Sequence, residues 1–279
     1  MRILVTGAAG FVGSHLAKHL VAAGHSVVAV WHRSDRRLTG IVGIERVQAD
    51  LRTPHSLPAR IDAVVHAAVS YGSDEASAAD IAATQALLAY AGGAGATAFI
   101  YLSSVDVYGT VSVPQVDEAS VPNNPNAYGR AKLHNEELVA AAPMATIALR
   151  LPGIVGPDHN RPWIARLAAE MAETGRASVY NPDSPFNNSL HVDDLCRFVA
   201  RLLDTGWKGH RLVTLAAAQP IAIRTIVERL MALRYSNAQL HVVDGRRHPY
   251  TIAIDNAVRD FGFAPMSMDE QLIRFAKEL

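Results

Sequence analysis

Short apolar runs alternate with segments of helical spacing through the first half of the chain. The segments predicted to be strands are residues 1–6, 26–30, 45–50, 62–67, 98–103 and 146–151. The predicted helices are residues 14–24, 76–94 and 128–141. Apolar strands that alternate with helices are typical of a parallel sheet covered on both faces. The pattern therefore predicts an α/β protein with a Rossmann-like, doubly wound parallel sheet.

The alternation loosens after residue 152. Proline and glycine interrupt this part of the chain, at Pro152, Gly153, Gly156, Pro157 and Pro162. Helical spacing returns at residues 163–174, 193–204 and 223–233. We predict a dinucleotide-binding domain over residues 1–152 and a smaller C-terminal substrate-binding lobe over 153–279. The two are expected to be interleaved, with part of 186–215 completing the sheet.

Composition and charge narrow the class of protein. The 279 residues are 49% hydrophobic and 19% charged, as in an ordinary soluble enzyme. The formal net charge of zero gives no electrostatic reason to expect nucleic acid or a membrane as a partner. No apolar segment approaches the roughly 20 residues of a membrane span. Cys196 is the single cysteine, which agrees with a reducing compartment. We expect a cytoplasmic protein with a small-molecule substrate.

A glycine turn separates the first predicted strand from the first predicted helix. Gly7, Gly10 and Gly13 are spaced G-x-x-G-x-x-G, and the helix follows from Ser14. Glycines let the backbone turn tightly and approach a phosphate, and a helix N-terminus offers unpaired N–H groups and the positive end of its dipole. The turn therefore predicts a binding site for a dinucleotide pyrophosphate.

The predicted helix 128–141 begins with a second informative motif, Tyr128-Gly129-Arg130-Ala131-Lys132. Residues four apart share one helix face, and a neighbouring ammonium favours the phenolate form of tyrosine. Tyr128 is thus a candidate acid/base and Lys132 its partner. Ser104 follows the predicted strand 98–103, at the sheet edge where open parallel sheets bind ligands, and could hold a substrate oxygen.

At this point the chain resembles the extended short-chain dehydrogenase/reductase family, of the NAD-dependent epimerase/dehydratase type. Besides the two motifs above, it carries similar segments in the family's order at residues 64–68, 102–109, 149–157 and 190–195. The resemblance implies a Rossmann domain, bound NAD or NADP, and hydride transfer with Tyr128, Lys132 and Ser104 as the catalytic residues. It also implies a homodimer through the helices 76–94 and 128–141.

The resemblance and the motifs together predict the residues that contact the cofactor. They are Gly7, Gly10, Phe11, Val12, Gly13, Arg33, Asp50, Leu51, Ala67, Tyr128, Lys132 and Pro152. No carboxylate stands at the end of the second strand, where NAD enzymes bind the ribose 2′-hydroxyl. Arg33, helped by Arg36 or Arg37, suits a 2′-phosphate, so we expect NADP rather than NAD. A solvated loop explains these arginines nearly as well.

The candidate substrate residues are Tyr71, Ser104, Val105, Asp106, Gly153, Asn187 and Arg247. Sugar-nucleotide enzymes of the family commonly carry asparagine where Gly153 stands and arginine near Asn187, which weakens a nucleotide sugar as the substrate. Arg246 and Arg247 lie where the family supplies another phosphate-binding arginine. Val105 and Asp106 stand where dehydratases carry an Asp-Glu pair, so only one carboxylate is present and dehydration is disfavoured.

These observations predict an NAD(P)-dependent oxidoreductase acting at a hydroxyl or keto carbon of a sugar or nucleotide sugar. The alternatives are an NADPH-dependent reductase of a small non-nucleotide carbonyl compound and a non-catalytic dinucleotide sensor. The 12 histidines are scattered and predict no metal site. His66 and His191 are expected to be satisfied inside the core, and Asp193 to cap the helix that follows it.

Overall fold

The computed structural model describes residues 1–70, 73–159, 161–245 and 248–279. These residues form two compact units. The first comprises Met1–Thr110, Val121–Arg150 and Cys196–Val213, and the second comprises Val111–Ser120, Leu151–Leu195 and Thr214–Leu279. The domain boundary expected at residue 152 stays a prediction.

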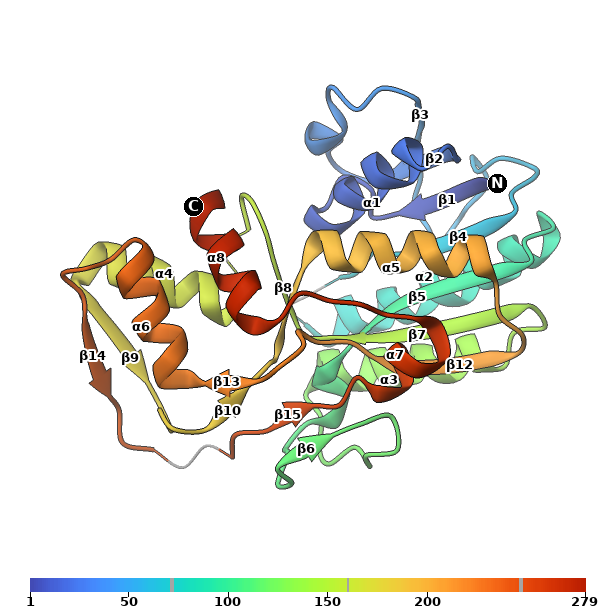
Figure 1. Ribbon diagram of the computed structural model, residues 1–279. Coiled ribbons are helices and arrows are strands. Elements are labelled where there is room, and N and C mark those ends of the chain that lie inside the picture. The colour runs from blue at the N-terminus through green and yellow to red at the C-terminus, as the bar shows by residue number, and fades with distance from the viewer. Residues whose placement is uncertain (71–72, 160, 246–247) are drawn as a thin grey trace. The chain divides into compact units, whose positions relative to one another are not determined.

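A seven-stranded sheet forms the centre of the first unit (Figure 1). Its order is β12-β7-β5-β4-β1-β2-β3, and β1 pairs in parallel with both β2 and β4. The strands are β1 (Arg2–Thr6), β2 (Ser26–Trp31), β3 (Ile44–Gln48), β4 (Ala63–His66), β5 (Ala98–Ser104), β7 (Ala145–Leu151) and β12 (His210–Thr214). Because β2 and β3 extend from β1 to one side and β4 and β5 to the other, the sheet is doubly wound. This confirms the predicted fold class.

Helices cover both faces of this sheet. They are α1 (Phe11–Ala22), α2 (Asp74–Gly93), α3 (Ala127–Ala140) and α5 (Val192–Thr205), with the short 3₁₀ helices η1 (Arg36–Leu38) and η2 (Val105–Tyr108). In Figure 1, α1 and α5 lie on one face, and α2 and α3 lie on the other. Ile3, Leu4 and Val5 are consecutive in β1 and all completely buried. Because helices cover both faces of the sheet, this central strand is apolar on both sides, as the sequence pattern predicted.

The described residues of the second unit form pairs of short strands and four helices. The strand pairs are β8–β11, β9–β14 and β6–β15, all parallel, and the antiparallel pair β10–β13. Their bounds are β6 (Gln115–Val116), β8 (Gly153–Val155), β9 (Arg176–Val179), β10 (Pro185–Phe186), β11 (Ser189–His191), β13 (Ile221–Ala222), β14 (Gln239–Val242) and β15 (Thr251–Ile252). The helices are α4 (Trp163–Thr174), α6 (Ile223–Leu233), α7 (Asp255–Phe261) and α8 (Met268–Glu278). Apolar side chains of α4, α6 and α8 form this unit's core.

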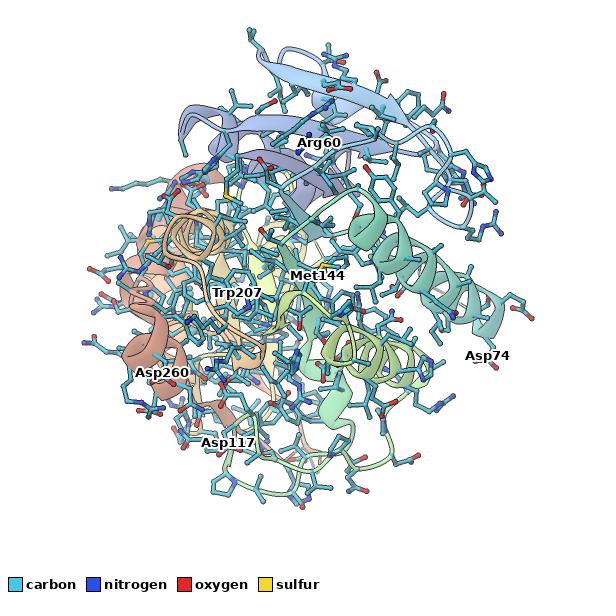
Figure 2. All side chains as sticks on the ribbon, turned by 90° about the vertical axis from the view of Figure 1, so that its right-hand side faces the viewer. Arg60, Asp74, Asp117, Met144, Trp207 and Asp260 are labelled. Atoms are coloured by element: carbon cyan, nitrogen blue, oxygen red, sulfur yellow. The ribbon has the colours of Figure 1, made fainter. Side chains whose placement is uncertain are left out.

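Local signals fix where several helices begin and end. The Ser73 side chain accepts the Ala76 N–H at 3.1 Å, so α2 begins at Asp74, two residues before the predicted start. Figure 2 shows Asp74 at the outer end of this helix. Gly175 ends α4 in the left-handed region, with φ of +67°. Helices α4 and α6 have the predicted bounds.

Candidate active site

The glycine turn lies between β1 and α1 and is tightly folded. Gly7 has φ of +62°, and a Cβ at Gly13 would lie 2.1 Å from the Gly7 carbonyl oxygen. A Cβ at Gly7 would lie 2.7 Å from the backbone of Ala68, just after β4. Gly10 precedes α1 and has no side chain to cap it. The turn thus brings the backbone close to β4 and leaves the start of α1 without a side-chain cap, which fits a pyrophosphate.

The other predicted cofactor residues of the first unit lie in its loops. Arg33 is exposed just after β2. Arg37 of η1 lies 6.0 Å from the ring centre of Phe11, in the first turn of α1. Asp50 accepts hydrogen bonds from the Arg52 backbone and guanidinium, and these bonds lower the pKa of the Asp50 carboxyl to about 2. Leu51 and Ala67 are half-buried, whereas Pro152 is buried in the second unit.

Helix α3 carries the tyrosine–lysine pair. The Asn126 side chain accepts the Gly129 N–H at 2.8 Å and caps this helix. Tyr128 is half-buried, and Lys132 lies one turn later, with its Nζ 5.8 Å from the centre of the Tyr128 ring. The two side chains therefore share one face of α3, as their spacing predicts.

Lys132 is almost fully buried, with 2% of its surface exposed. Its Nζ donates to the Leu102 carbonyl oxygen at 3.0 Å and lies 4.7 Å from the centre of the Tyr101 ring. Burial lowers the pKa of the Lys132 ammonium, and the negative charges of Asp80 and Glu136 oppose this shift. These two carboxylates favour the charged form of the lysine, whereas its burial disfavours that form.

Ser104 ends β5 and begins η2. Its Oγ accepts the Asp106 N–H at 3.1 Å and so caps this short helix. Gly129 explains how α3 approaches η2, because a Cβ at Gly129 would lie 2.3 Å from the Asp106 carbonyl oxygen. Val105 is half-buried and Asp106 is exposed. The glycine between the tyrosine and the lysine thus lets the segment that carries Ser104 pack against the start of α3.

An open pocket of about 390 Å³ adjoins Tyr128 in the first unit. It is lined by Ser70, Ser73, Asp74, Ser77, Asn126, Ala127 and Tyr128. Ser77 Oγ lies 3.2 Å from the Ser73 carbonyl oxygen and 3.5 Å from the Ala127 carbonyl oxygen, and it can donate its proton to either while its lone pairs stay available. The pocket therefore offers hydroxyl, amide and carboxylate groups beside the phenol. The sequence motifs had not indicated it, since its residues come from the starts of two separate helices and from the loop before α2.

Two of the remaining candidate substrate residues, Gly153 and Asn187, lie in the second unit. Gly153 begins β8 in the second unit, and a Cβ there would lie 3.2 Å from the Pro162 side chain. Asn187 is buried, donates to the Ala217 and Ile252 carbonyl oxygens, and accepts the Ile252 N–H, so its amide joins segments of this unit. Tyr71, Arg246 and Arg247 lie outside the described residues.

The histidines at strand ends are satisfied internally, as predicted. His66 is buried between Thr6 and Thr84, and His191 bonds Glu278 with its Nε2. The prediction that Asp193 caps α5 is wrong. Asp193 lies inside the first turn of α5, where its carboxylate pairs with Arg274. Its backbone N–H donates instead to His191 Nδ1, because the imidazole already stands in the capping position just before the helix.

The described residues present no candidate for two other kinds of site. Within the described ranges, no group of three or more histidine, cysteine, aspartate or glutamate side chains is arranged to hold a metal ion. Among the helices that the structure describes, none combines the length and the apolar character that crossing a bilayer requires.

A doubly wound parallel sheet with a glycine turn after its first strand defines a dinucleotide-binding α/β protein. Residues 3–214 match the model of the NAD dependent epimerase/dehydratase family. The chain belongs to this family, and it is an enzyme of the extended short-chain dehydrogenase/reductase type. The family assignment predicted from the sequence motifs is therefore confirmed.

Similar proteins act on different substrates, to judge by their names. The chain is 28% identical over 256 residues to 2-alkyl-3-oxoalkanoate reductase of Stenotrophomonas maltophilia (strain K279a), covering 83% of this chain and 75% of that protein. It is 27% identical over 276 residues to UDP-glucose 4-epimerase of Erwinia amylovora, covering 82% and 81%. UDP-glucuronic acid 4-epimerase from Bacillus cereus, solved in complex with NAD, has the same fold, with a TM-score of 0.85 at 22% identity over 100% and 96% of the two chains.

Proposed function

We propose that this enzyme transfers a hydride between a bound nicotinamide dinucleotide and a hydroxyl or keto carbon of a sugar or nucleotide sugar. The observation that carries the proposal is the pairing of Tyr128 with the buried Lys132 on one face of α3. Tyr128 lines an open polar pocket, and both residues lie in the unit that holds the glycine turn. Family membership supports a dinucleotide as the cofactor.

The chain's own residues fit such a cofactor. In the turn from Gly7 to Gly13, a Cβ at either of these two glycines would clash with the nearby backbone. The turn leads into the N-terminus of α1, which has no side-chain cap. This arrangement would hold the pyrophosphate, and Lys132 would bond the nicotinamide ribose. When bound, the dinucleotide supplies the hydride acceptor or donor.

In the proposed mechanism, Tyr128 exchanges a proton between its Oη and the substrate oxygen. The positive charge of Lys132 favours the phenolate form of Tyr128, which the oxidation direction requires. The Ser104 hydroxyl holds the same substrate oxygen. Val105 and Asp106 supply one carboxylate rather than two, so the proposal is hydride transfer without loss of water.

The pocket beside Tyr128 favours the hydroxylated part of a sugar. Its described lining offers serine hydroxyls, the Asn126 amide and the Asp74 carboxylate, and no cation among these groups would attract a phosphate. The name of the 28% identical relative, a 2-alkyl-3-oxoalkanoate reductase, favours a second candidate, the reduction of a 3-oxo acid. The two candidates share the tyrosine and the lysine and differ in what fills the pocket.

The first experiment pairs a turnover assay with Tyr128→Phe. We expect turnover with UDP-glucose or with a 3-oxoalkanoate, and a loss of roughly 10²-fold or more in kcat on replacing Tyr128, with the dinucleotide affinity unchanged. Tyr90→Phe is the matched control, since this hydroxyl donates only to the Pro58 carbonyl oxygen at 2.6 Å. Full activity of Tyr128→Phe, or no binding of either dinucleotide, contradicts the proposal.

We further propose NADP as the preferred cofactor. Arg33 and Arg37 are exposed near the end of β2, and Asp35 is engaged with Arg46, its carboxylate 3.5 Å from the guanidinium. A guanidinium suits a 2′-phosphate better than a 2′-hydroxyl. Arg33→Ala is expected to weaken NADPH binding about tenfold and NADH binding less than twofold, as measured by titration.

Arg60→Ala controls for the loss of surface charge. Arg60, labelled in Figure 2, is exposed before the amino end of β4. Arg33, by contrast, follows the carboxyl end of β2. An equal effect of Arg33→Ala on both dinucleotides contradicts the NADP preference. So does stoichiometric NAD⁺, identified by mass spectrometry, in the denatured wild-type protein.

We propose a homodimer as the assembly, formed through α2 and α3. These helices lie side by side on one face of the first unit's sheet (Figure 1). Light scattering after size exclusion is expected to give twice the mass of the chain, and a monomer at micromolar concentration contradicts this assembly.

A further inference from the structure

A buried polar layer lies beneath α2 and α3 in the first unit. Asp80 of α2 is 5% exposed, Lys132 of α3 is 2% exposed, and Asn135 and Tyr101 are completely buried. Taking a charge out of water is costly, so each buried charge in such a layer requires a partner.

One pair of charges in this layer is complete by itself. Arg150 of β7 donates to the Glu136 carboxylate from both Nε and Nη2, at 3.0 and 2.8 Å. Ser103 donates to the same carboxylate at 2.6 Å. Glu136 is thus paired with Arg150, and its charge affects the pKa of Lys132 less than the charge of Asp80 does.

Asp80 receives its hydrogen bonds from neutral groups. The Ser70 backbone N–H donates to Oδ1 at 3.2 Å, and Asn135 Nδ2 donates to Oδ2 at 3.0 Å. His66 of β4 adds no charge, because burial lowers the pKa of its imidazole to about 3. Tyr101 stays neutral since burial raises the pKa of its phenol. Among the described residues of this layer, the cation that remains for Asp80 is Lys132.

The same groups also fix where the ammonium lies. Asn135 Nδ2 donates to the Tyr101 hydroxyl at 3.0 Å as well as to Asp80. The Tyr101 ring faces Lys132 Nζ at 4.7 Å. Asp80 thus orients Asn135, Asn135 holds Tyr101, and the Tyr101 ring forms one wall of the space that the ammonium occupies.

We propose that Asp80 is the counter-ion of Lys132, a positioning residue that keeps the ammonium charged and in place while it is buried. The catalytic consequence of this role rests on the proposed function, since a neutral Lys132 would no longer favour the Tyr128 phenolate. The counter-ion role itself concerns the folded protein and does not require turnover.

The direct test is the pKa of Lys132 in the full-length protein. The chain has four lysines, Lys18, Lys132, Lys208 and Lys277, so NMR of lysine labelled with ¹³C and ¹⁵N at the side-chain end resolves each of them. Lys132→Met assigns the signal. Asp80→Asn keeps the shape and removes the charge, and it is expected to lower the pKa of Lys132 by about one unit, a tenfold change in its protonation equilibrium.

Glu75→Gln is the matched control, since Glu75 is an exposed carboxylate of the same helix. It is expected to leave the Lys132 titration where it is in the wild type. A titration of Lys132 that is the same in Asp80→Asn as in Glu75→Gln overturns the proposal. A catalytically inactive protein leaves this measurement readable, so failure of the proposed reaction is distinguishable from failure of the counter-ion.

A double-mutant cycle covers the case in which Asp80→Asn is poorly folded. Asp80→Asn, Lys132→Met and the double variant are compared by urea unfolding. If the two charges are partners, the double variant has an unfolding equilibrium constant at least tenfold smaller than the two single effects multiplied together predict. Effects that multiply to within twofold overturn the proposal.

Discussion

His66 lies between two hydroxyl groups, and the directions of their hydrogen bonds fix its tautomer. Thr84 Oγ1 donates to the Asp80 carbonyl oxygen at 2.9 Å, so it can only accept from His66 Nε2 at 3.1 Å. Nδ1 must then be the acceptor for Thr6 Oγ1 at 2.7 Å. Thr6 Oγ1 in turn accepts the Ala68 N–H, next to the glycine turn. A neutral imidazole satisfies every bond of this chain, and a charged one does not.

We predict a loss of stability on acidification that depends on His66. Burial lowers the pKa of this imidazole to about 3, whereas an unfolded histidine titrates near ~6.5. Below pH ~6.5 the imidazole of His66 binds a proton in the unfolded chain but not in the native protein. The contribution of the neutral His66 to the free energy of unfolding is therefore complete above pH ~6.5 and is lost as pH falls toward ~3. From pH ~7 to ~5 the loss is ~2 kcal/mol.

Urea unfolding at the two pH values measures this effect. His66→Gln is expected to lose about 2 kcal/mol less than the wild type over the interval, whatever its stability at pH ~7. His134→Gln, whose imidazole is exposed on α3, is expected to follow the wild type. An identical pH dependence in all three proteins contradicts the assignment.

Helix α3 packs closely against the short helix η2. Gly129 has no side chain, and a Cβ added there would lie 2.3 Å from the Asp106 carbonyl oxygen. The motif around Tyr128 and Lys132 therefore includes a glycine for steric reasons. The helix has to approach η2, which Ser104 caps, this closely.

We predict that Gly129→Ala forces α3 away from η2. The expected cost is ~1–3 kcal/mol of unfolding free energy, as for overpacking, together with a lower kcat. Gly93→Ala is the control, because a Cβ on this helical glycine of α2 would have nothing within 4 Å of it. That change is expected to stabilise by up to ~1 kcal/mol, since alanine is the better helix former. Equal thermal stabilities of the two variants contradict the steric argument.

A buried ion pair, Glu136 with Arg150, connects three secondary-structure elements of the first unit. Glu136 of α3 contacts Arg150 of β7 and Ser103 of β5, and both charged side chains are at most 7% exposed. Such a pair contributes little compared with apolar packing, but breaking it leaves a charge without compensation.

Glu136→Gln is therefore predicted to destabilise the protein by ~3–5 kcal/mol. Glu137→Gln, one residue along the helix with a side chain 70% exposed, is expected to change the stability by less than ~0.5 kcal/mol. Calorimetry of the two variants against the wild type measures the difference. A Glu136→Gln protein as stable as Glu137→Gln contradicts the importance of the pair.

Much of the fold was predictable from local patterns. The bounds of α4 and α6 were predicted without error, and the apolar runs that became β1, β4 and β5 were placed to within two residues at each end. These patterns act over neighbouring residues, through periodicity, caps and breaks. The start of α2 was placed too late because the Ser73 cap was not recognised, although Ser73 with Asp74 and Glu75 after it is a start signal.

The candidate site was only partly predictable. Local patterns were enough for the sheet, the glycine turn and the shared face of Tyr128 and Lys132, because each follows from spacing within one short segment. Asp80 is 52 residues from Lys132 and lies within an alanine-rich helix, with no local pattern to mark it. Its role depends on the packing of α2 beside α3, which excludes water between them and brings the carboxylate and the ammonium into one buried layer where each charge needs the other.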